Sequence, residues 1–312
     1  MKQSNIVFLD AATLGDSDLG PIRDCGQLTC YPTSSPEEAL ERVKDCEVLI
    51  INKVKVTPEL IEAAPKLELI CEAATGVNNI DLAYAASKGI KVMNVAGYST
   101  QTVVQVTFML ILSLAGKLPY FDQSVKSGRY SSSGIFTDVS VTFPELYGKT
   151  IGIIGMGNIG STVARIASAF GMQVVYYSTS GTSHCKEYPS LPIGELLEKS
   201  DIVSIHAPLN ERTSNLIGKK ELARMKSSAI LINMGRGGIV NEAELAEAVD
   251  AGVIAGAGMD VFTIEPLPAS HPFMNMEHPE RMLFTPHIGW ASSEARVRLV
   301  SAIAENIRSV MF

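Results

Sequence analysis

The stretch that decides the fold is Thr150-Ile151-Gly152-Ile153-Ile154-Gly155-Met156-Gly157-Asn158-Ile159-Gly160. An apolar, β-branched run ends in a G-x-G-x-x-G loop, and residues 159–170 continue with the spacing of a helix. Strand, glycine loop and helix in this order predict the phosphate-binding turn of a doubly wound α/β domain. A glycine turn without a ligand is the alternative, which the flanking strand and helix disfavour.

Each part of this loop has an expected role toward a dinucleotide. Gly155 permits the tight turn, Gly157 lets a pyrophosphate approach the backbone, and Gly160 lets the helix pack closely on the sheet. The amides of Asn158 and Ile159 stand at the positive end of the helix dipole and would point at the phosphates. The loop therefore predicts binding of NAD(H) or NADP(H).

The choice between these dinucleotides depends on the end of the next predicted strand, residues 174–178. An acidic side chain there accepts hydrogen bonds from the ribose 2′-OH and would repel a 2′-phosphate. This strand ends in Ser178, and the Thr179-Ser180-Gly181 that follows holds no acid. We expect a relaxed preference in which NADP(H) is accepted, with His184 and Lys186 as the nearest possible cations.

Short apolar runs alternate with helical patterns along most of the chain. This alternation, with strands that are apolar throughout, predicts parallel sheets and crossover helices. Because the runs form two series, the expected fold class is α/β with two doubly wound parallel-sheet domains. An apolar helix at 100–115 would connect the series, residues 127–134 would form a surface loop, and a last helix would cover 292–310. The expected strands are 6–10, 48–51, 67–71, 91–94, 150–154, 174–178, 202–205, 230–233, 256–260 and 282–285.

Composition and charge limit the classes of function. The 312 residues are 46% hydrophobic and 19% charged, which excludes a disordered chain. A formal charge of −7 without a Lys/Arg run gives no support to nucleic-acid binding. No apolar stretch reaches the roughly 20 residues that cross a bilayer and no secretory leader is recognisable, so we expect a cytoplasmic protein without a membrane partner. The five scattered cysteines are expected to be free thiols, with no metal site.

Three polar side chains, Arg236, Glu265 and His287, follow successive predicted strands of the second series. Ligands of open α/β sheets bind beyond the carboxyl ends of the strands, so these residues are candidates for one site. A guanidinium suits a carboxylate, and a histidine held in its charged form by a carboxylate is a common acid/base arrangement. Each residue alone is better explained as solvated or structural, but together they predict a catalytic constellation.

His206 and Asp260 also end buried strands in the sequence pattern. We expect His206 to line the cofactor side of the site. An unpaired carboxylate at the position of Asp260 would be costly, so this side chain should have a partner. The nicotinamide carboxamide is one candidate partner, and a helix cap is the alternative.

Five ordered motifs resemble the D-isomer-specific 2-hydroxyacid dehydrogenase family over about residues 48–307. They are residues 74–81, 155–160, 200–209, 233–240 and 286–290. The resemblance implies a homodimer and a Rossmann-like cofactor domain, residues 100–285, inserted in a flavodoxin-like substrate domain of residues 1–99 and 286–312. Asn52-Lys53 and the His-x-x-Trp ending look most like the glycerate dehydrogenase or hydroxypyruvate reductase branch, whereas Ser178 departs from the usual acidic residue.

The resemblance also implies hydride transfer between C4 of a nicotinamide and C2 of a small 2-oxo acid, in a cleft that closes to exclude water. Arg236 would grip the substrate carboxylate, and His287, kept charged by Glu265, would donate the proton. Arg236 and His287 would contact cofactor and substrate alike, and the amides of Gly76 and Val77 would bind the carboxylate. Further cofactor contacts are expected from Thr75, His206, Ala207, Pro208, Met234, Asp260 and Gly289. The substrate pocket is expected to include Lys53, Tyr98 and Trp290.

Two alternatives share this fold. A corepressor would sense the dinucleotide without turning over a metabolite, but no segment resembles a partner-docking tail. A formate dehydrogenase would usually carry Gln at the position of Glu265, because its reaction transfers no proton.

Overall fold

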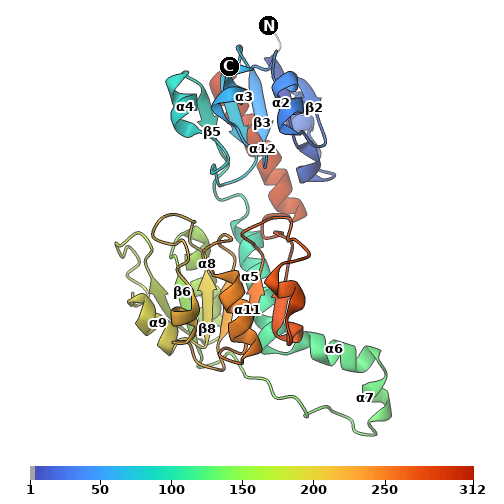
Figure 1. Ribbon diagram of the computed structural model, residues 1–312, viewed down its shortest axis with the longest axis vertical. Helices are drawn as coiled ribbons and strands as arrows, with labels where there is room; N and C mark the ends of the chain where they lie inside the picture. The colour runs from blue at the N-terminus through green and yellow to red at the C-terminus, as the bar shows by residue number, and fades with distance from the viewer. Residues whose placement is uncertain (1–3) are drawn as a thin grey trace. The chain divides into compact units, whose positions relative to one another are not determined.

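The computed structural model describes residues 4–312 (Figure 1). The chain forms two compact units, one made of Met1–Ser99 with Trp290–Phe312 and the other of Thr100–Gly289. Each is built around one sheet whose strands are all parallel. The predicted fold class, two parallel-sheet α/β domains, is therefore confirmed.

Unit 1 has a five-stranded sheet in the order β2-β1-β3-β4-β5. Its strands are β1 (Ser4–Phe8), β2 (Gly26–Cys30), β3 (Val48–Ile51), β4 (Leu69–Glu72) and β5 (Lys91–Met93). Its helical elements are η1 (Ala11–Leu14), α1 (Gly20–Arg23), α2 (Pro36–Arg42), α3 (Pro58–Glu62), α4 (Leu82–Ser87) and α12 (Ser293–Met311). This flavodoxin-like order reverses between β1 and β3, where ligands of open sheets bind.

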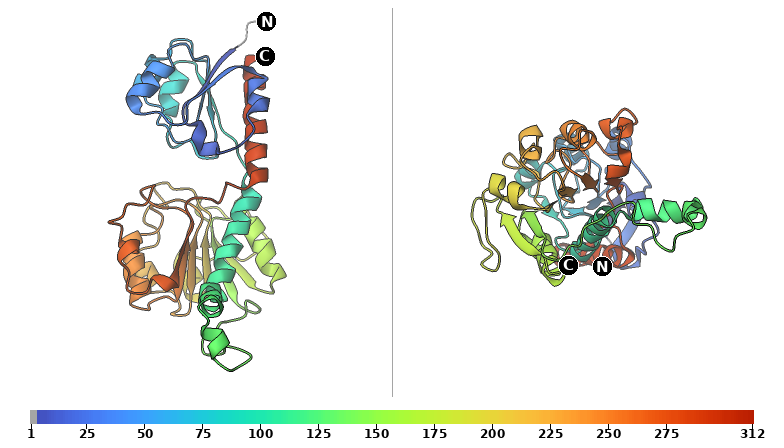
Figure 2. Two further views of the ribbon diagram at one scale, coloured as in Figure 1. Left: turned by 90° about the vertical axis from the view of Figure 1, so that its right-hand side faces the viewer. Right: turned by 90° about the horizontal axis from the view of Figure 1, so that it is seen from below.

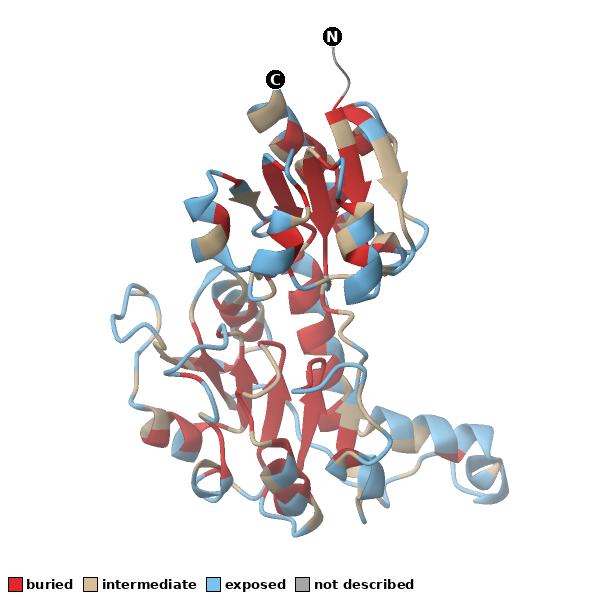
Figure 3. Cartoon of the chain, turned by 45° about the horizontal axis from the view of Figure 1, so that its top comes forward, coloured by how far each residue is buried: buried red, intermediate tan, exposed pale blue. Residues whose placement is uncertain are grey.

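The strands of unit 1 are apolar on both sides because helices cover both faces of the sheet (Figure 3). Ile6 and Phe8 of β1 pack with α1 and α12, while Val7 packs with α2, α3 and α4. The edge strand β2 was missed by the sequence analysis. Its Gln27 is exposed and its last three residues are half-buried, so no apolar run marks it.

Unit 2 has a six-stranded sheet in the order β11-β10-β9-β8-β6-β7, which lies between two layers of helices (Figure 2). Its strands are β6 (Thr150–Ile154), β7 (Gln173–Tyr177), β8 (Ile202–Ile205), β9 (Ile230–Asn233), β10 (Gly256–Met259) and β11 (Met282–Phe284). One layer holds α5 (Thr100–Ala115) and α8 (Asn158–Ala169); the other holds α9 (Ile193–Lys199), α10 (Lys219–Leu222) and α11 (Glu242–Asp250). The order reverses between β6 and β8, as in a Rossmann fold.

Between α5 and β6 the chain forms an arm that projects from unit 2 (Figure 1). It contains α6 (Leu118–Lys126) and α7 (Arg129–Ser132), followed by an irregular segment. The prediction of a surface loop at 127–134 was wrong for α7. Arg129 stacks on Tyr120 and donates a hydrogen bond from its Nε to the Ser124 hydroxyl at 3.0 Å, and these contacts hold the short helix against α6.

Residues 286–289 belong to compact unit 2, whereas the sequence analysis expected them in the other domain. The reason is Asp260, which follows β10 and accepts hydrogen bonds from the amides of Ile288 and Gly289, each at 2.9 Å. These bonds hold the segment against the strand ends of unit 2.

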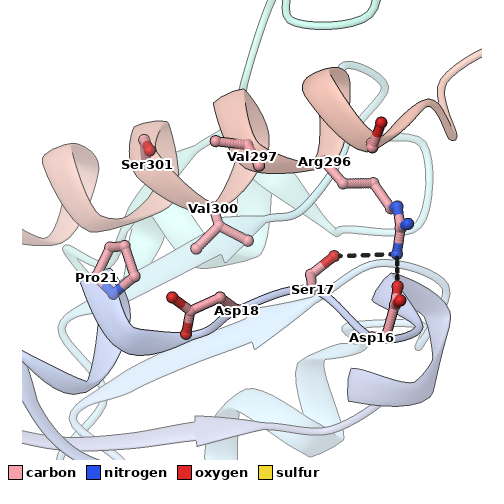
Figure 4. A pocket seen from close by; sticks show the side chains of 9 residues that line it. Asp16, Ser17, Asp18, Pro21, Arg296, Val297, Val300 and Ser301 are labelled. Carbon is pink, nitrogen blue, oxygen red and sulfur yellow. Dashed lines mark hydrogen bonds and ion pairs between the residues drawn. The ribbon is translucent and has the colours of Figure 1, made fainter.

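Helix α12 is fixed to the beginning of unit 1 by Arg296. Its Nη1 donates to the carbonyl oxygen of Leu14 at 3.0 Å and to the Asp16 carboxylate at 2.5 Å. These contacts lie at one end of a shallow hollow of about 280 Å³ between α12 and residues 16–21 (Figure 4). In the described part of the chain no single helix has both the length and the apolar composition to cross a membrane.

Candidate active site

The glycine loop between β6 and α8 forms a cradle with open space beside it. Gly155 has a φ of +93°, and a Cβ at this position would lie 3.0 Å from the backbone of Ala207, so glycine alone makes the turn without strain. A Cβ on Gly160 would collide with the carbonyl oxygen of Gly155. No heavy atom lies within 4 Å of the place that a Cβ of Gly157 would occupy. This space and the unpaired first amides of α8, including those of Asn158 and Ile159, fit a pyrophosphate.

The loop after β7 carries no acidic side chain at its start. The hydroxyl of Ser178 donates to the carbonyl oxygen of Thr182 at 2.6 Å and lies 3.1 Å from the hydroxyl of Ser180. The carbonyl oxygen of Tyr177 accepts a hydrogen bond from the amide of Gly155 at 3.0 Å. We call residues 178–182 the serine loop. This hydrogen bond makes the serine loop and the glycine loop neighbours.

His206 begins the loop after β8, followed by Ala207 and Pro208. Its Nε2 lies 2.8 Å from the Ser204 hydroxyl, and its Nδ1 is buried without a partner in the described part of the chain. Burial lowers the pKa of His206 to about 3, so the imidazole is neutral near pH 7. It therefore offers a neutral polar edge next to the glycine turn, which touches Ala207.

Arg236 lies in the loop after β9, and Asn233 sets the shape of that loop. The Asn233 side chain accepts from the amide of Gly235 and donates to the carbonyl oxygen of Arg236, both at 3.0 Å. A Cβ on Gly237 would collide with the Phe262 backbone, so the loop packs directly on the segment that leads to Glu265. The Arg236 side chain is half-buried and donates to the carbonyl oxygen of Gly235 at 2.9 Å. Met234, the first residue of the loop after β9, is buried.

Glu265 and His287 form the pair that the sequence predicted. The Oε2 of Glu265 lies 2.7 Å from the Nδ1 of His287, and its Oε1 accepts from the amide of Phe262 at 3.0 Å. His287 has a φ of +54°, which is uncommon for a residue with a side chain. The carboxylate thus fixes one ring nitrogen, and Nε2 remains for a ligand.

Asp260 holds the backbone around His287. Its carboxylate accepts from the Thr285 hydroxyl at 2.5 Å and from the amides of Ile288 and Gly289. Burial is the largest influence on this carboxyl and raises its pKa. Its oxygens are already hydrogen-bonded within the protein, so the predicted bond to a nicotinamide carboxamide stays a prediction.

A buried carboxylate plays the same part in unit 1. Asp10, just after β1, accepts hydrogen bonds from the amides of Asn52, Lys53 and Val54 at 3.0, 2.6 and 3.1 Å. Burial raises its pKa, and the three amides act in the opposite direction. This arrangement at the reversal of strand order fixes the loop that presents the exposed Lys53 side chain.

The loop that contains Thr75, Gly76 and Val77 follows β4 in unit 1. The Thr75 hydroxyl donates to the carbonyl oxygen of Val95 at 3.0 Å, which fixes the loop at one end. At the other end, Asn79 donates from its Nδ2 to the carbonyl oxygen of Val54 and to the Glu72 carboxyl, both at 3.0 Å. The loop and its neighbour, which carries Lys53, are therefore joined by side-chain hydrogen bonds.

Tyr98 and Trp290 pack with the hydrophobic core of unit 1. Tyr98 is only 7% exposed, and Trp290, partly buried, packs against the cluster that includes Leu299 and Ile303 of α12. Their placement in a substrate pocket stays a prediction.

Sequence reasoning missed several residues that shape these loops. Glu242 at the start of α11 accepts from the amide of Thr263 at 2.7 Å and its carboxylate lies 2.9 Å from Nε2 of His271. A polar residue at the end of a predicted strand, or directly after it, was a usable signal for Asp10 and Glu72. Nothing in the spacing of the sequence pairs Glu242 with His271.

The strand ends of unit 2 therefore carry two features: a glycine loop that fits a pyrophosphate, and His287, whose imidazole can donate or accept a proton. Transfer of a hydride to a carbonyl carbon leaves an oxygen that needs a proton, so an enzyme for this reaction requires both features. The fold and the site therefore define the class of nicotinamide-dependent oxidoreductases.

Comparisons with known proteins agree with this class. Residues 108–289 match the model of the NAD-binding domain of D-isomer specific 2-hydroxyacid dehydrogenases. A glyoxylate reductase of Korarchaeum cryptofilum is 38% identical over 88% of this chain and 82% of its own length. A glycerate dehydrogenase of Methylorubrum extorquens is 34% identical over 97% of this chain and 95% of its own. The solved structure of an acyclic imino acid reductase in complex with NADPH and D-Arg has a TM-score of 0.87 and 31% identity, covering 98% of this chain and 97% of that one.

The chain belongs to the D-isomer specific 2-hydroxyacid dehydrogenase family. It is an oxidoreductase that acts on a CH–OH group and uses NAD(H) or NADP(H), as the sequence predicted. A corepressor is not favoured, since the names of the Korarchaeum and Methylorubrum relatives are those of enzymes.

Proposed function

We propose that the chain interconverts a small 2-oxo acid of the glyoxylate or hydroxypyruvate type and the corresponding D-2-hydroxy acid. The observation that carries this proposal is the 2.7 Å contact between Glu265 and His287, next to the loop of Arg236. The names of the glyoxylate reductase and glycerate dehydrogenase relatives support a substrate of this size.

Each residue has a separate task in the reductive direction. The glycine loop would hold the pyrophosphate of the dinucleotide, which when bound would supply the hydride for C2 of the oxo acid. Arg236 binds the substrate carboxylate through its planar guanidinium and polarises the keto oxygen. His287 donates a proton from Nε2 to that oxygen, while Glu265 accepts a hydrogen bond from Nδ1 and fixes the orientation of the ring. In the oxidative direction His287 is the general base.

Within unit 1, considered by itself, we propose a carboxylate-binding loop. The amides of Gly76 and Val77 bind the substrate carboxylate, and Lys53 adds positive charge. The hydrogen bonds of Asp10 to the Lys53 loop and of Asn79 to both loops support this assignment, since they hold the backbone before a substrate arrives.

The test is steady-state turnover of glyoxylate, hydroxypyruvate, pyruvate and 2-oxoglutarate with NADH and with NADPH. We expect the two smallest acids to be preferred and His287→Ala to lower kcat by roughly a hundredfold or more, the usual contribution of a general acid. His278→Ala, at a histidine of the same unit whose side chain is 41% exposed, is the matched control. Full activity of the His287 variant, or turnover of none of the four acids, would contradict the proposal.

We further propose a homodimer formed through the arm of unit 2. The arm exposes a group of apolar side chains, with Phe136 90% and Val139 79% exposed, and such patches mark interfaces between proteins. Light scattering after size exclusion should give twice the mass of one chain. Phe136→Ser with Val139→Ser should shift this mass toward the monomer, and a monomeric wild type would refute the assignment.

We place the protein in the cytoplasm. The five free cysteines support this location, because thiols stay reduced there. Fractionation of cells that express the native chain tests this assignment.

A further inference from the structure

A guanidinium from the loop after β8 reaches the serine loop after β7. The Nη1 of Arg212 donates to the carbonyl oxygen of Ser180 at 2.7 Å. The same nitrogen lies 3.2 Å from the place that a Cβ on Gly181 would take, and Gly181 has a φ of +81°. Arg212 therefore lies against the serine loop, and the absence of a side chain at Gly181 leaves it room.

The serine loop lies where the adenine ribose of a dinucleotide is expected, so the contact of Arg212 with this loop bears on cofactor binding. The serine loop begins where the carbonyl oxygen of Tyr177 accepts from the amide of Gly155, so it adjoins the pyrophosphate cradle. In a doubly wound domain the adenine ribose lies at the end of this second strand. A residue on this loop therefore faces the 2′ position of the ribose.

The charges around the loop favour an anion. Residues 178–182 hold no acidic side chain that would repel a phosphate. The carboxylates nearest in sequence are Glu187, farther along this loop, and Glu211, which directly precedes Arg212. In residues 4–312 no carboxylate forms an ion pair with Arg212. The Ser180 carbonyl occupies one of its five N–H donors. The donors that remain suit the geometry of a phosphate.

We propose that Arg212 is the residue that binds the 2′-phosphate of NADP(H) and so sets the preference of this enzyme between the two dinucleotides. Its contact with the Ser180 carbonyl orients the guanidinium, and residues 178–182 hold no carboxylate that would repel the phosphate. The inference rests on the dinucleotide site described above. Arg212 is not among the residues that the sequence pattern of a dinucleotide-binding domain assigns to that site.

The experiment measures binding directly, by calorimetric titration of the full chain with NADPH, NADH and adenosine 2′,5′-bisphosphate. The variants are Arg212→Gln, which removes the charge, and Arg212→Lys, which keeps it. Arg165→Gln, at an exposed arginine of the same unit, is the matched control. Turnover of glyoxylate with NADH is followed in parallel.

We expect Arg212→Gln to weaken binding of NADPH and of the bisphosphate by about tenfold or more, the usual loss for a charge-assisted hydrogen bond. Binding and turnover of NADH should be unchanged, Arg212→Lys should retain part of the affinity for NADPH, and Arg165→Gln should have no effect. Equal weakening of NADH and NADPH would show a purely structural role for Arg212 and overturn the proposal. Unchanged NADPH binding, or a wild type that binds only NADH, would overturn it too. Loss of turnover alone, with these affinities as expected, would count against the proposed reaction and not against Arg212.

Discussion

We expect Glu72→Gln to remove most of the pH dependence of the stability of unit 1. The Glu72 side chain is fully buried at the end of β4. Its Oε2 accepts from Asn79 at 3.0 Å, whereas its Oε1 is buried with no partner in the described part of the chain. Burial, with the nearby Asp10 acting in the same direction, raises the pKa of Glu72 to about 8. The folded protein therefore holds a proton on this carboxyl at neutral pH.

The raised pKa of Glu72 sets both the sign and the size of its effect on the free energy of unfolding. The pKa of Glu72 rises from 4.5 to about 8, and each unit corresponds to about 1.4 kcal/mol, so the change is on the order of 5 kcal/mol at most. Below the unfolded pKa both the folded and the unfolded chain hold the proton, so Glu72 adds no pH dependence to the stability there. As the pH rises from there through about 8, the unfolded chain releases the proton while the folded one keeps it, and the free energy of unfolding falls. Burial also raises the pKa of Asp10, so part of the wild-type slope belongs to that residue.

Trp290 makes the measurement specific for unit 1, because it is the only tryptophan and packs against the core of that unit. Urea unfolding followed by its fluorescence gives the free energy of unfolding at about pH 4.5, 6 and 7.5. At the lowest pH, Glu72→Gln should match the wild type within about 1 kcal/mol, because glutamine has the shape of the protonated acid. At the highest pH, the variant should be the more stable. Glu68→Gln, at an exposed position on the same segment, should keep the wild-type slope. Parallel curves for wild type and Glu72→Gln would refute the assignment of a buried proton.

The remaining predictions concern unit 2. Glu265→Gln should lower kcat for reduction, because the neutral amide is a weaker acceptor for the Nδ1 proton of His287 and no longer fixes the ring as firmly, and an unchanged kcat would speak against the pair. Arg236→Lys should lower kcat/KM for glyoxylate by roughly a hundredfold, since the ammonium cannot bind a carboxylate through two parallel bonds; wild-type kinetics would exclude the assigned role. Ser178→Asp should depress kcat/KM with NADPH relative to NADH, because the new carboxylate repels a 2′-phosphate; a constant ratio of the two would disprove it.

The parts of the site that could be predicted lie directly after strands. Glycines at 155, 157 and 160 mark a turn that few other sequences can make, and Arg236, Glu265 and His287 each follow an apolar run. Parallel strands bring their carboxyl ends to the same edge of a sheet, so knowledge of the strands was enough to group these residues. The 2.7 Å contact between Glu265 and His287 is the outcome of that rule.

The parts that could not be predicted depend on contacts between distant segments. Arg212 comes from the loop of a different strand than Ser180, and its contact is set by the path of a loop, which has no periodicity. Helix α7 depends on the side chain of Arg129 reaching Ser124 and Tyr120. Short, polar segments of this kind have weak local preferences, so tertiary contacts decide their structure.

In both units a buried carboxyl, Asp10 in unit 1 and Asp260 in unit 2, accepts hydrogen bonds from the backbone amides of a loop at the strand ends. A loop that must present a side chain at a strand end has backbone amides without partners, which would be costly if left buried. Asp10 satisfies three such amides around Lys53, and Asp260 satisfies two around His287. Burial raises the pKa of each carboxyl, so each acid costs stability to keep charged. The hydrogen bonds of these carboxyls fix the backbone beside Lys53 and His287, and a rigid backbone at those positions is what the proposed carboxylate binding and proton transfer require.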